Sequence, residues 1–149
     1  MADTRVQLEV EDWVRKNWMP TAYGRKFRRE RLKLRSGGMF DFDAVCDEDE
    51  IVATISTSSS LTSGGKHGVG KLMKLRSDML FLLMASAKRR IVVLTEEDMY
   101  KRCLAESKSG RVPPEIEFAL AAIPDDLREK LVSAKSASSK EVTPNDPNR

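Results

Sequence analysis

The most regular alternation of hydrophobic and polar residues lies between residues 39 and 57 and predicts a two-strand hairpin. Residues 39–46 alternate as in a strand with one buried face. Residues 51–57 are rich in β-branched side chains, which suit a pleated surface, and the acids at 47–50 are expected to form the turn. The first strand is expected to place Phe40, Phe42, Ala44 and Cys46 on one face and Met39, Asp41, Asp43 and Val45 on the other.

The turn sets the register of this hairpin. If the four-residue turn joins directly opposed positions, Asp43 lies opposite Thr54 and Asp41 lies opposite Ser56. Side chains at opposed positions point to the same face of a sheet. One face of the hairpin is therefore expected to be acidic on its first strand and hydroxyl-bearing on its second.

Helical patterns flank the hairpin. Before it, apolar residues recur at three- and four-residue steps and predict a helix with one buried stripe, which Pro20 is expected to end. The stripe consists of Val6, Val10, Trp13, Val14 and Trp18. After the hairpin, residues 69–85 are apolar around most of a helical circumference, so this helix is expected to be buried on more than one side.

The C-terminal half adds one more strand and several helices. The unbroken apolar run 91–94 predicts a parallel strand covered on both faces, and a helix follows it to about residue 107. Residues 116–123 and 127–131 are expected to form two short helices separated by Pro124. The polar residues from 135 onward predict a disordered tail. We therefore expect an α/β fold with a mixed sheet, as a single domain at 1–134 with a tail at 135–149.

Composition agrees with this picture. The chain has 149 residues, of which 40% are hydrophobic and 33% are charged, which suits one globular domain with a core of its own. Its two cysteines lie on a predicted strand and a predicted helix, and no basic and then apolar leader precedes them, so we expect a cytoplasmic protein. The longest apolar run, 79–85, is far shorter than the roughly 20 residues that cross a bilayer, so no membrane partner is expected.

Positive charge is concentrated before the hairpin. Between Arg15 and Arg35 there are nine basic residues and one acid, Glu30. Such a segment is either a solvated strand face that discourages edge pairing or a surface for the phosphates of nucleic acid. The candidate nucleic-acid-binding residues are Arg25, Lys26, Arg28, Arg29, Arg31, Lys33 and Arg35, with Lys66 and Lys71 from the loop after the hairpin.

The loop after the hairpin resembles the first part of a phosphate-binding loop. Gly65 and Gly70-Lys71 have the GxxxxGK spacing, and the loop lies between a strand and a helix. However, Leu72 occupies the position of the hydroxyl residue that would bind magnesium. A nucleotide-hydrolysing site is therefore not expected. The amides at the helix N-terminus, beside Lys66, His67, Lys71 and Lys74, could still hold a phosphate of a larger ligand.

The order of the segments FDFDAV, IVATISTS, a helix and RRIVVLT resembles the core of the restriction-endonuclease-like superfamily, the PD-(D/E)xK nucleases. The resemblance covers residues 37–106. It implies two carboxylates that hold Mg²⁺ for phosphodiester cleavage and a lysine that orients the nucleophile.

Only part of the superfamily motif is present. Asp43 matches its metal-binding aspartate, whereas Thr54 stands where its second acid would be and Ser56 where its lysine would be. A hydroxyl supplies neither the negative nor the positive charge. We therefore expect a nuclease-like domain that has lost cleavage and retains a nucleic-acid-binding or scaffold role, with DNA rather than RNA as the partner and no cofactor.

Three alternatives stay open. The chain could be an active magnesium-dependent nuclease with a relocated carboxylate, in which Asp41 and Asp43 hold the metal and Asp78 is the only acid on the following helix. It could be a subunit that binds another protein, or a second copy of itself, through its basic strand. It could also be a small α/β protein whose charges serve only solubility.

Overall fold

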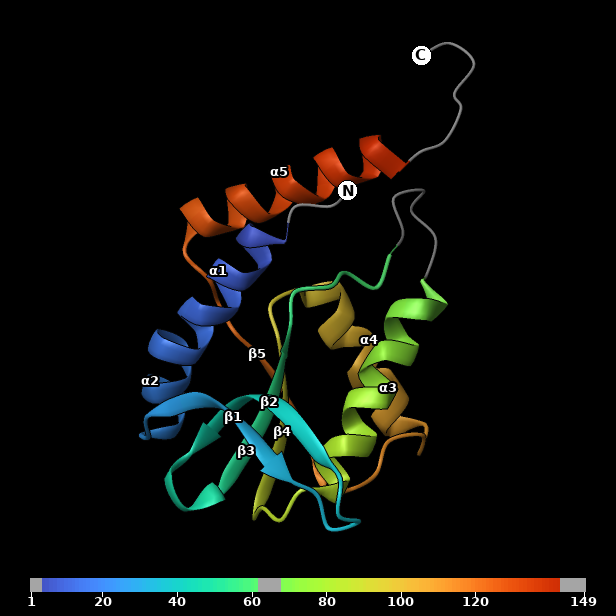
Figure 1. The fold of residues 1–149 in the computed structure, drawn as a ribbon. Helices are drawn as coiled ribbons and strands as arrows, with labels where there is room; N and C mark the ends of the chain where they lie inside the picture. The colour runs from blue at the N-terminus through green and yellow to red at the C-terminus, as the bar shows by residue number, and fades with distance from the viewer. Residues whose placement is uncertain (1–3, 62–67, 143–149) are drawn as a thin grey trace.

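The computed structural model describes residues 4–61 and 68–142, which form a mixed five-stranded sheet with helices on both faces (Figure 1). The strand order is β1-β2-β3-β4-β5. The first three strands are antiparallel neighbours, and β4 and β5 both run parallel to β3. The strands are β1 (Phe27–Lys33), β2 (Met39–Cys46), β3 (Ile51–Ser56), β4 (Arg89–Leu94) and β5 (Ile116–Leu120).

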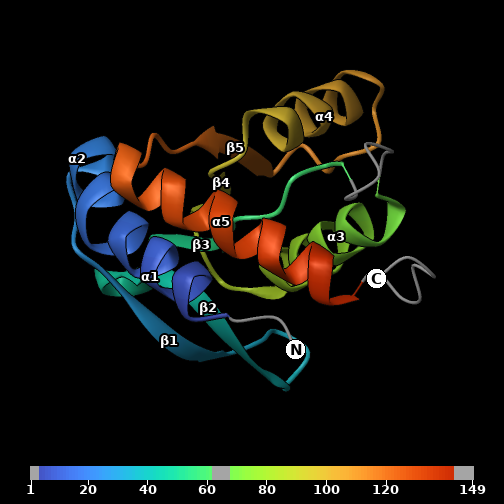
Figure 2. The same ribbon diagram turned by 90° about the horizontal axis from the view of Figure 1, so that it is seen from above.

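Helices cover the two faces of the sheet as separate groups (Figure 2). On one face lie α1 (Arg5–Trp13), α2 (Met19–Tyr23) and α5 (Asp125–Val142). On the other lie α3 (Val69–Met84), which connects β3 to β4, and α4 (Glu97–Lys108), which connects β4 to β5. Each group of helices closes a hydrophobic core against the central strands.

The alternation of β3 and β4 explains the two cores. Ile51, Ala53 and Ile55 face the core beneath α1 and α5, whereas Val52 faces the core beneath α3 and α4. Both faces of β3 and β4 are covered, which accounts for their continuous apolar runs. The predicted parallel strand at 91–94 is therefore confirmed, as is the mixed character of the sheet.

The predicted register of the hairpin is confirmed where β2 pairs with β3. Ala44 lies opposite Ala53 and Val45 lies opposite Val52. The predicted faces of β2 are wrong, however: Phe42 and Val45 lie in the core beneath α3, and Ala44 and Cys46 lie in the opposite core. A β-bulge causes this change, because Asp43 and Ala44 together oppose a single β1 residue, Arg29, between the pairs 28–45 and 30–42.

The N-terminal helix does not end at Pro20. A π-helical segment at Val14–Trp18 follows α1 and leads directly into α2, where Pro20 lies in the first turn. Proline lacks the amide that would continue the helical hydrogen bonds, and the π-helical segment immediately before it accommodates this interruption. The helix ends instead at Gly24, whose φ of 68° is left-handed.

The C-terminal predictions also need correction. Residues 116–120 form the edge strand β5 and not a short helix. The final helix α5 extends to Val142, so residues 135–142, which composition predicts to be disordered, are helical. Within the part of the chain that the structure describes, no helix is long and apolar enough to cross a membrane.

Candidate functional site

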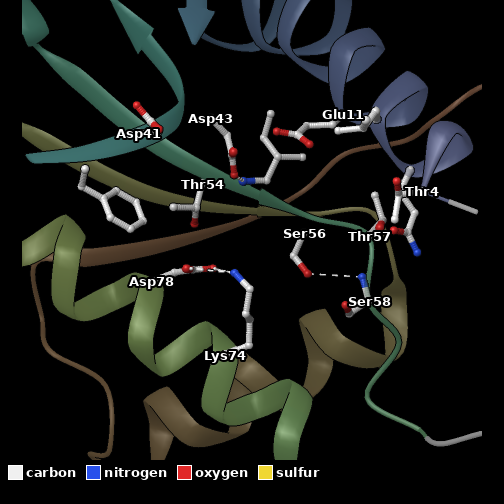
Figure 3. A pocket seen from close by; sticks show the side chains of 14 residues that line it. Thr4, Glu11, Asp41, Asp43, Thr54, Ser56, Thr57, Ser58, Lys74 and Asp78 are labelled. Atoms are coloured by element: carbon white, nitrogen blue, oxygen red, sulfur yellow. Dashed lines mark hydrogen bonds and ion pairs between the residues drawn. The ribbon is translucent and has the colours of Figure 1, made fainter. Parts of the chain in front are cut away.

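A pocket of about 500 Å³ lies where β2 separates from β3 (Figure 3). Its walls come from α1, from β2 and β3 with the segment that follows β3, and from α3. The Ala44–Ala53 pair ends the pairing between β2 and β3 next to the bulge. The pocket therefore lies at a fork between strands that is open to both helical layers.

Asp43 lies at the bulge and bridges the fork. Its Oδ2 accepts a hydrogen bond of 2.8 Å from the backbone N–H of Ile55. The side chain thus provides an acceptor for a β3 amide just beyond the last backbone pair between the two strands. Its backbone carbonyl accepts a hydrogen bond of 3.1 Å from Nη1 of Arg15, whose guanidinium is buried in the π-helical segment. Bulges often redirect a side chain beside a functional site, and this one fixes the Asp43 carboxylate at the pocket wall.

Glu11 approaches Asp43 from α1. Thr4, Gln7, Leu8 and Glu11 are spaced along one face of the N-terminal helical segment and line the pocket. The Glu11 side chain is only 15% exposed, and its Oε1 lies 3.7 Å from Arg15 Nη1 without a hydrogen-bond partner. The structure thus leaves a buried carboxyl oxygen of Glu11 unsatisfied.

Glu11 and Asp43 form a carboxyl pair on the α1 side of the pocket. Burial and the neighbouring Asp43 carboxyl raise the pKa of Glu11 to about 8, against the opposing effect of Arg15 and Arg29. The shift favours the protonated form of Glu11 beside Asp43. Positive charge, from a proton or from a cation, is therefore favoured between these two acids.

The opposite wall of the pocket, on α3, contains an ion pair between Asp78 and Lys74. Asp78 Oδ1 lies 3.3 Å from Lys74 Nζ, one helical turn away (Figure 3). Burial raises the pKa of Asp78, Lys74 lowers it, and the charge of Asp43 raises it further. The carboxylates of the two walls are thus close enough to interact across the pocket.

The motif positions on β3 lie in the same pocket but differ from one another. Thr54 is 3% exposed, and its hydroxyl has no hydrogen-bond partner. Ser56 Oγ accepts a hydrogen bond of 3.2 Å from the backbone N–H of Ser58, so it already has a local role. Asp41 lines the pocket from an exposed position on β2. The structure thus brings together Asp41, Asp43, Thr54, Ser56 and Asp78 as pocket residues.

The predicted basic residues separate into paired and unpaired groups. Several are already held: Arg25 by Glu50 at 2.6 Å, Arg28 by Glu30 and Asp47 at 2.9 Å each, Arg35 by the Leu83 carbonyl, and Lys71 by the Leu61 carbonyl at 3.1 Å. Lys66 and His67 lie outside the described residues. Among described residues of the basic segment, the side chains without a hydrogen bond or ion pair are Lys26, Arg29, Arg31 and Lys33.

Three of these unpaired residues form a basic row, Arg29, Arg31 and Lys33, at alternate positions along the edge strand β1. Arg31 lies directly opposite Asp41, and Arg29 lies opposite the bulge. The charge of Arg29 lowers the pKa of Glu11, which indicates that the row ends beside the carboxyl pair. The row therefore borders the pocket on the same face as Asp41.

The donor set of the pocket fits a magnesium-type ion better than a closed transition-metal site. Mg²⁺ is commonly held by one or two carboxylates and keeps several waters, and the Glu11–Asp43 pair, with its unsatisfied oxygen, meets that requirement. Over residues 4–61 and 68–142, no group of three or more His, Cys, Asp or Glu side chains is arranged to hold a metal. A zinc-like site of three or four protein ligands is thus not formed by these residues.

The segment after β3, which completes the pocket, is held in place by a side chain of α5. Lys135 donates to the Thr57 carbonyl and lies 3.1 Å from Glu96 Oε1, and Glu96 also binds Arg128. Thr57 and Ser58 are pocket residues. The α5 helix therefore helps to position the hydroxyl-rich wall of the site.

Comparisons of the chain with protein-family models, with curated proteins and with solved structures give no match. The functional interpretation therefore rests on the geometry of the pocket and on the residues around it.

Glu11 is the pocket acid that sequence reasoning missed. The pattern of the first helix identifies its apolar stripe, which includes Val10 and Trp13, and Glu11 lies beside that stripe. Glu11 is also far from Asp43 in the sequence. The helical spacing of residues 4, 7, 8 and 11 indicates a second, half-polar face that could have been noticed. What that face contacts depends on how the helix crosses the sheet.

Proposed function

We propose that this chain is a nuclease-like protein of the restriction-endonuclease-like type, which binds nucleic acid along the basic row and cleaves a phosphodiester bond with a divalent cation held by Glu11 and Asp43. The pocket that brings Glu11 beside Asp43 is the observation on which this proposal rests. It supplies the second acid whose absence at Thr54 argued from the sequence against cleavage.

The fold supports this proposal. The elements follow one another in the order that the sequence resemblance implies. A helix precedes the antiparallel strands β1, β2 and β3, and a second helix then leads to β4, which is parallel to β3. Asp43 lies on the second strand, at the position that resembles the metal-binding aspartate. Fold alone does not fix function, so the site must supply the argument.

The chemistry of the site supports it as well. A divalent cation there would neutralise charge on the phosphate and lower the pKa of a bound water. Glu11 and Asp43 are ligands of the right kind once Glu11 has lost its proton. Arg15 would keep Asp43 in place through the bulge carbonyl, and the Ile55 N–H would keep its carboxylate oriented.

The basic row supports nucleic acid as the substrate. Lysine and arginine side chains that neutralise phosphates dominate nucleic-acid affinity. Those of the row form no ion pair among the described residues that a phosphate would have to break. A backbone that follows β1 passes Arg31 and Arg29 and reaches the carboxyl pair. Contacts of this kind are expected to bind with little base specificity.

A cleavage assay tests the proposal. The purified chain is incubated with supercoiled DNA and with labelled RNA in Mg²⁺, in Mn²⁺ and in EDTA. We expect cleavage that requires the metal and falls by about a hundredfold or more in Asp43→Asn, since that change removes a ligand charge while the amide oxygen can still accept from Ile55. The matched control is Asp49→Asn at the hairpin turn, where asparagine tolerates the φ of 55°.

Two results would count against the proposal. Cutting that persists in EDTA and in Asp43→Asn would come from a contaminant and not from this site. No retention of DNA or RNA even at about 50 mM salt, where phosphate contacts are strong, would remove nucleic acid as the partner.

A second candidate function is nucleic-acid binding without cleavage. The hydroxyl residues Thr54 and Ser56 at the two motif positions favour it. Salt-sensitive retention by the native chain, with no cleavage in either metal, would support this candidate over the first.

A further inference from the structure

The α3 side of the pocket contains a buried hydroxyl that nothing in the described structure satisfies. Thr54 is 3% exposed, lines the pocket, and its Oγ1 has neither a hydrogen-bond donor nor an acceptor beside it (Figure 3). A buried polar group without a partner is costly, so such groups usually meet water or a ligand. This hydroxyl therefore points to a ligand with hydrogen-bonding oxygen or nitrogen atoms.

Lys74 adds positive charge to the same wall. Its ammonium lies at 3.3 and 3.4 Å from the two Asp78 oxygens, and its side chain is 76% exposed on the pocket. An ammonium has three N–H donors, so it can bind a further acceptor while it stays beside Asp78. The charge of Asp78 thus positions Lys74 without using up its capacity to donate.

From these two residues we infer that Thr54 and Lys74 form a phosphate subsite, in which a non-bridging oxygen of the substrate accepts hydrogen bonds from the Thr54 hydroxyl and the Lys74 ammonium. The inference deepens the proposed function, on which it rests. The cation binds to Glu11 and Asp43 on the α1 side, and the phosphate lies between it and α3. Asp78 is a positioning residue for Lys74 and does not touch the phosphate.

This arrangement gives the departures from the superfamily motif a chemical meaning. A carboxylate at position 54 would repel a phosphate oxygen, whereas a hydroxyl can donate to it. The positive charge that Ser56 lacks comes from α3, one turn before Asp78. The pocket then has a wall for the cation and a wall for the anion.

The experiment titrates inorganic phosphate into the full chain, with and without Mg²⁺, and follows the backbone amides by NMR. We expect shifts at Thr54, Lys74 and Asp78, and tighter binding with Mg²⁺. Thr54→Val should weaken binding by about threefold to tenfold and Lys74→Met by roughly tenfold to a hundredfold, as expected for the loss of a neutral and of a charged hydrogen bond. Lys101→Met, on α4 and outside this pocket, should bind as the native chain does.

The same variants also show whether the substitutions disturb folding. Thr54→Val removes an unsatisfied hydroxyl and keeps the shape of the side chain, so its melting temperature should equal or exceed that of the native chain. A lower melting temperature would mean that the hydroxyl has a partner within the protein, and it would overturn the inference.

The outcomes separate this inference from the proposed cleavage. Native phosphate affinity in both Thr54→Val and Lys74→Met, or shifts confined to the basic row, would overturn the subsite even if Asp43-dependent cleavage is observed. If both variants lose phosphate binding but the native chain does not cleave nucleic acid, the subsite is supported and only the cleavage proposal fails.

Discussion

The two walls of the pocket each bury one carboxyl group, and the two groups differ chiefly in their partners. Glu11 on α1 is 15% exposed and Asp78 on α3 is 14% exposed, so their side chains are almost equally removed from solvent. Burial is the largest cause of the raised pKa in both. Glu11 has a second acid, Asp43, beside it as well as Arg15 at 3.7 Å, whereas Asp78 has the ammonium of Lys74 at 3.3 Å.

This difference determines what each wall can bind. Burial and the acid partner together raise the pKa of Glu11 to about 8, so the α1 wall holds a proton at neutral pH that a divalent cation could replace. Lys74 counters the rise at Asp78, so the α3 wall already has its positive charge. The α1 wall brings two acids together, and Arg15 and Arg29 only partly offset the raised pKa of Glu11. Burial together with a second acid, and not burial alone, therefore favours a cation there.

The largest effect that would sharpen this comparison is on metal affinity. Removing the charge of Glu11 with Glu11→Gln should weaken Mn²⁺ binding by about tenfold to a hundredfold, because the ion loses one of its two carboxylates. The matched change on the other wall, Asp78→Asn, should change it by less than about threefold, since Asp78 is held by Lys74. Titration of each variant with Mn²⁺, followed by its electron paramagnetic resonance, measures both. Equal losses in the two variants would break the comparison.

A smaller effect is expected on the pH dependence of stability. The folded pKa of Glu11 is about 8 and its ordinary value is 4.5, so its contribution to stability is complete below about pH 4.5 and is lost as the pH rises through 8. Glu11→Gln should therefore melt higher than the native chain at pH 8, by about 4–8 °C for roughly 2 kcal/mol after allowance for solvent screening.

The control is the same comparison at pH 5 and in Asp78→Asn. At pH 5 the native chain and Glu11→Gln should melt within about 2 °C of each other, because Glu11 is then protonated in the folded state. Asp78→Asn should gain less at pH 8, since it also gives up the ion pair with Lys74. A native melting temperature that does not fall between pH 5 and pH 8 relative to Glu11→Gln would contradict the raised pKa of Glu11.

Local patterns sufficed to predict much of the fold. The hairpin register follows from the short turn between two strands of strong β preference, and the apolar run 91–94 identified the central parallel strand. The strand β5 was missed because Ile116–Leu120 contains a single β-branched residue and its apolar spacing also fits a helix. The bulge at Asp43 was missed because it depends on the pairing of β2 with β1 and leaves no mark in the alternation of β2 itself.

The site was predictable only in part, because some of its residues are brought together by contacts between segments that are distant in the sequence. Residues on the hairpin, Asp43 and Thr54, could be placed from their register, and both line the pocket. Glu11 could not, because its position depends on how α1 crosses the sheet, which is set by packing between distant segments. The charge count of the basic segment likewise could not tell which residues have acidic neighbours, and the structure leaves Arg29, Arg31 and Lys33 unpaired.

The account depends most directly on the exchange of a proton for a divalent cation at Glu11 and Asp43. Calorimetric titration of the native chain with Mn²⁺ at pH 7, repeated in two buffers of different ionisation enthalpy, counts the protons released. We expect the release of about one proton for each ion bound, and none in Glu11→Gln. Binding without proton release, or no binding in either buffer, would contradict the account.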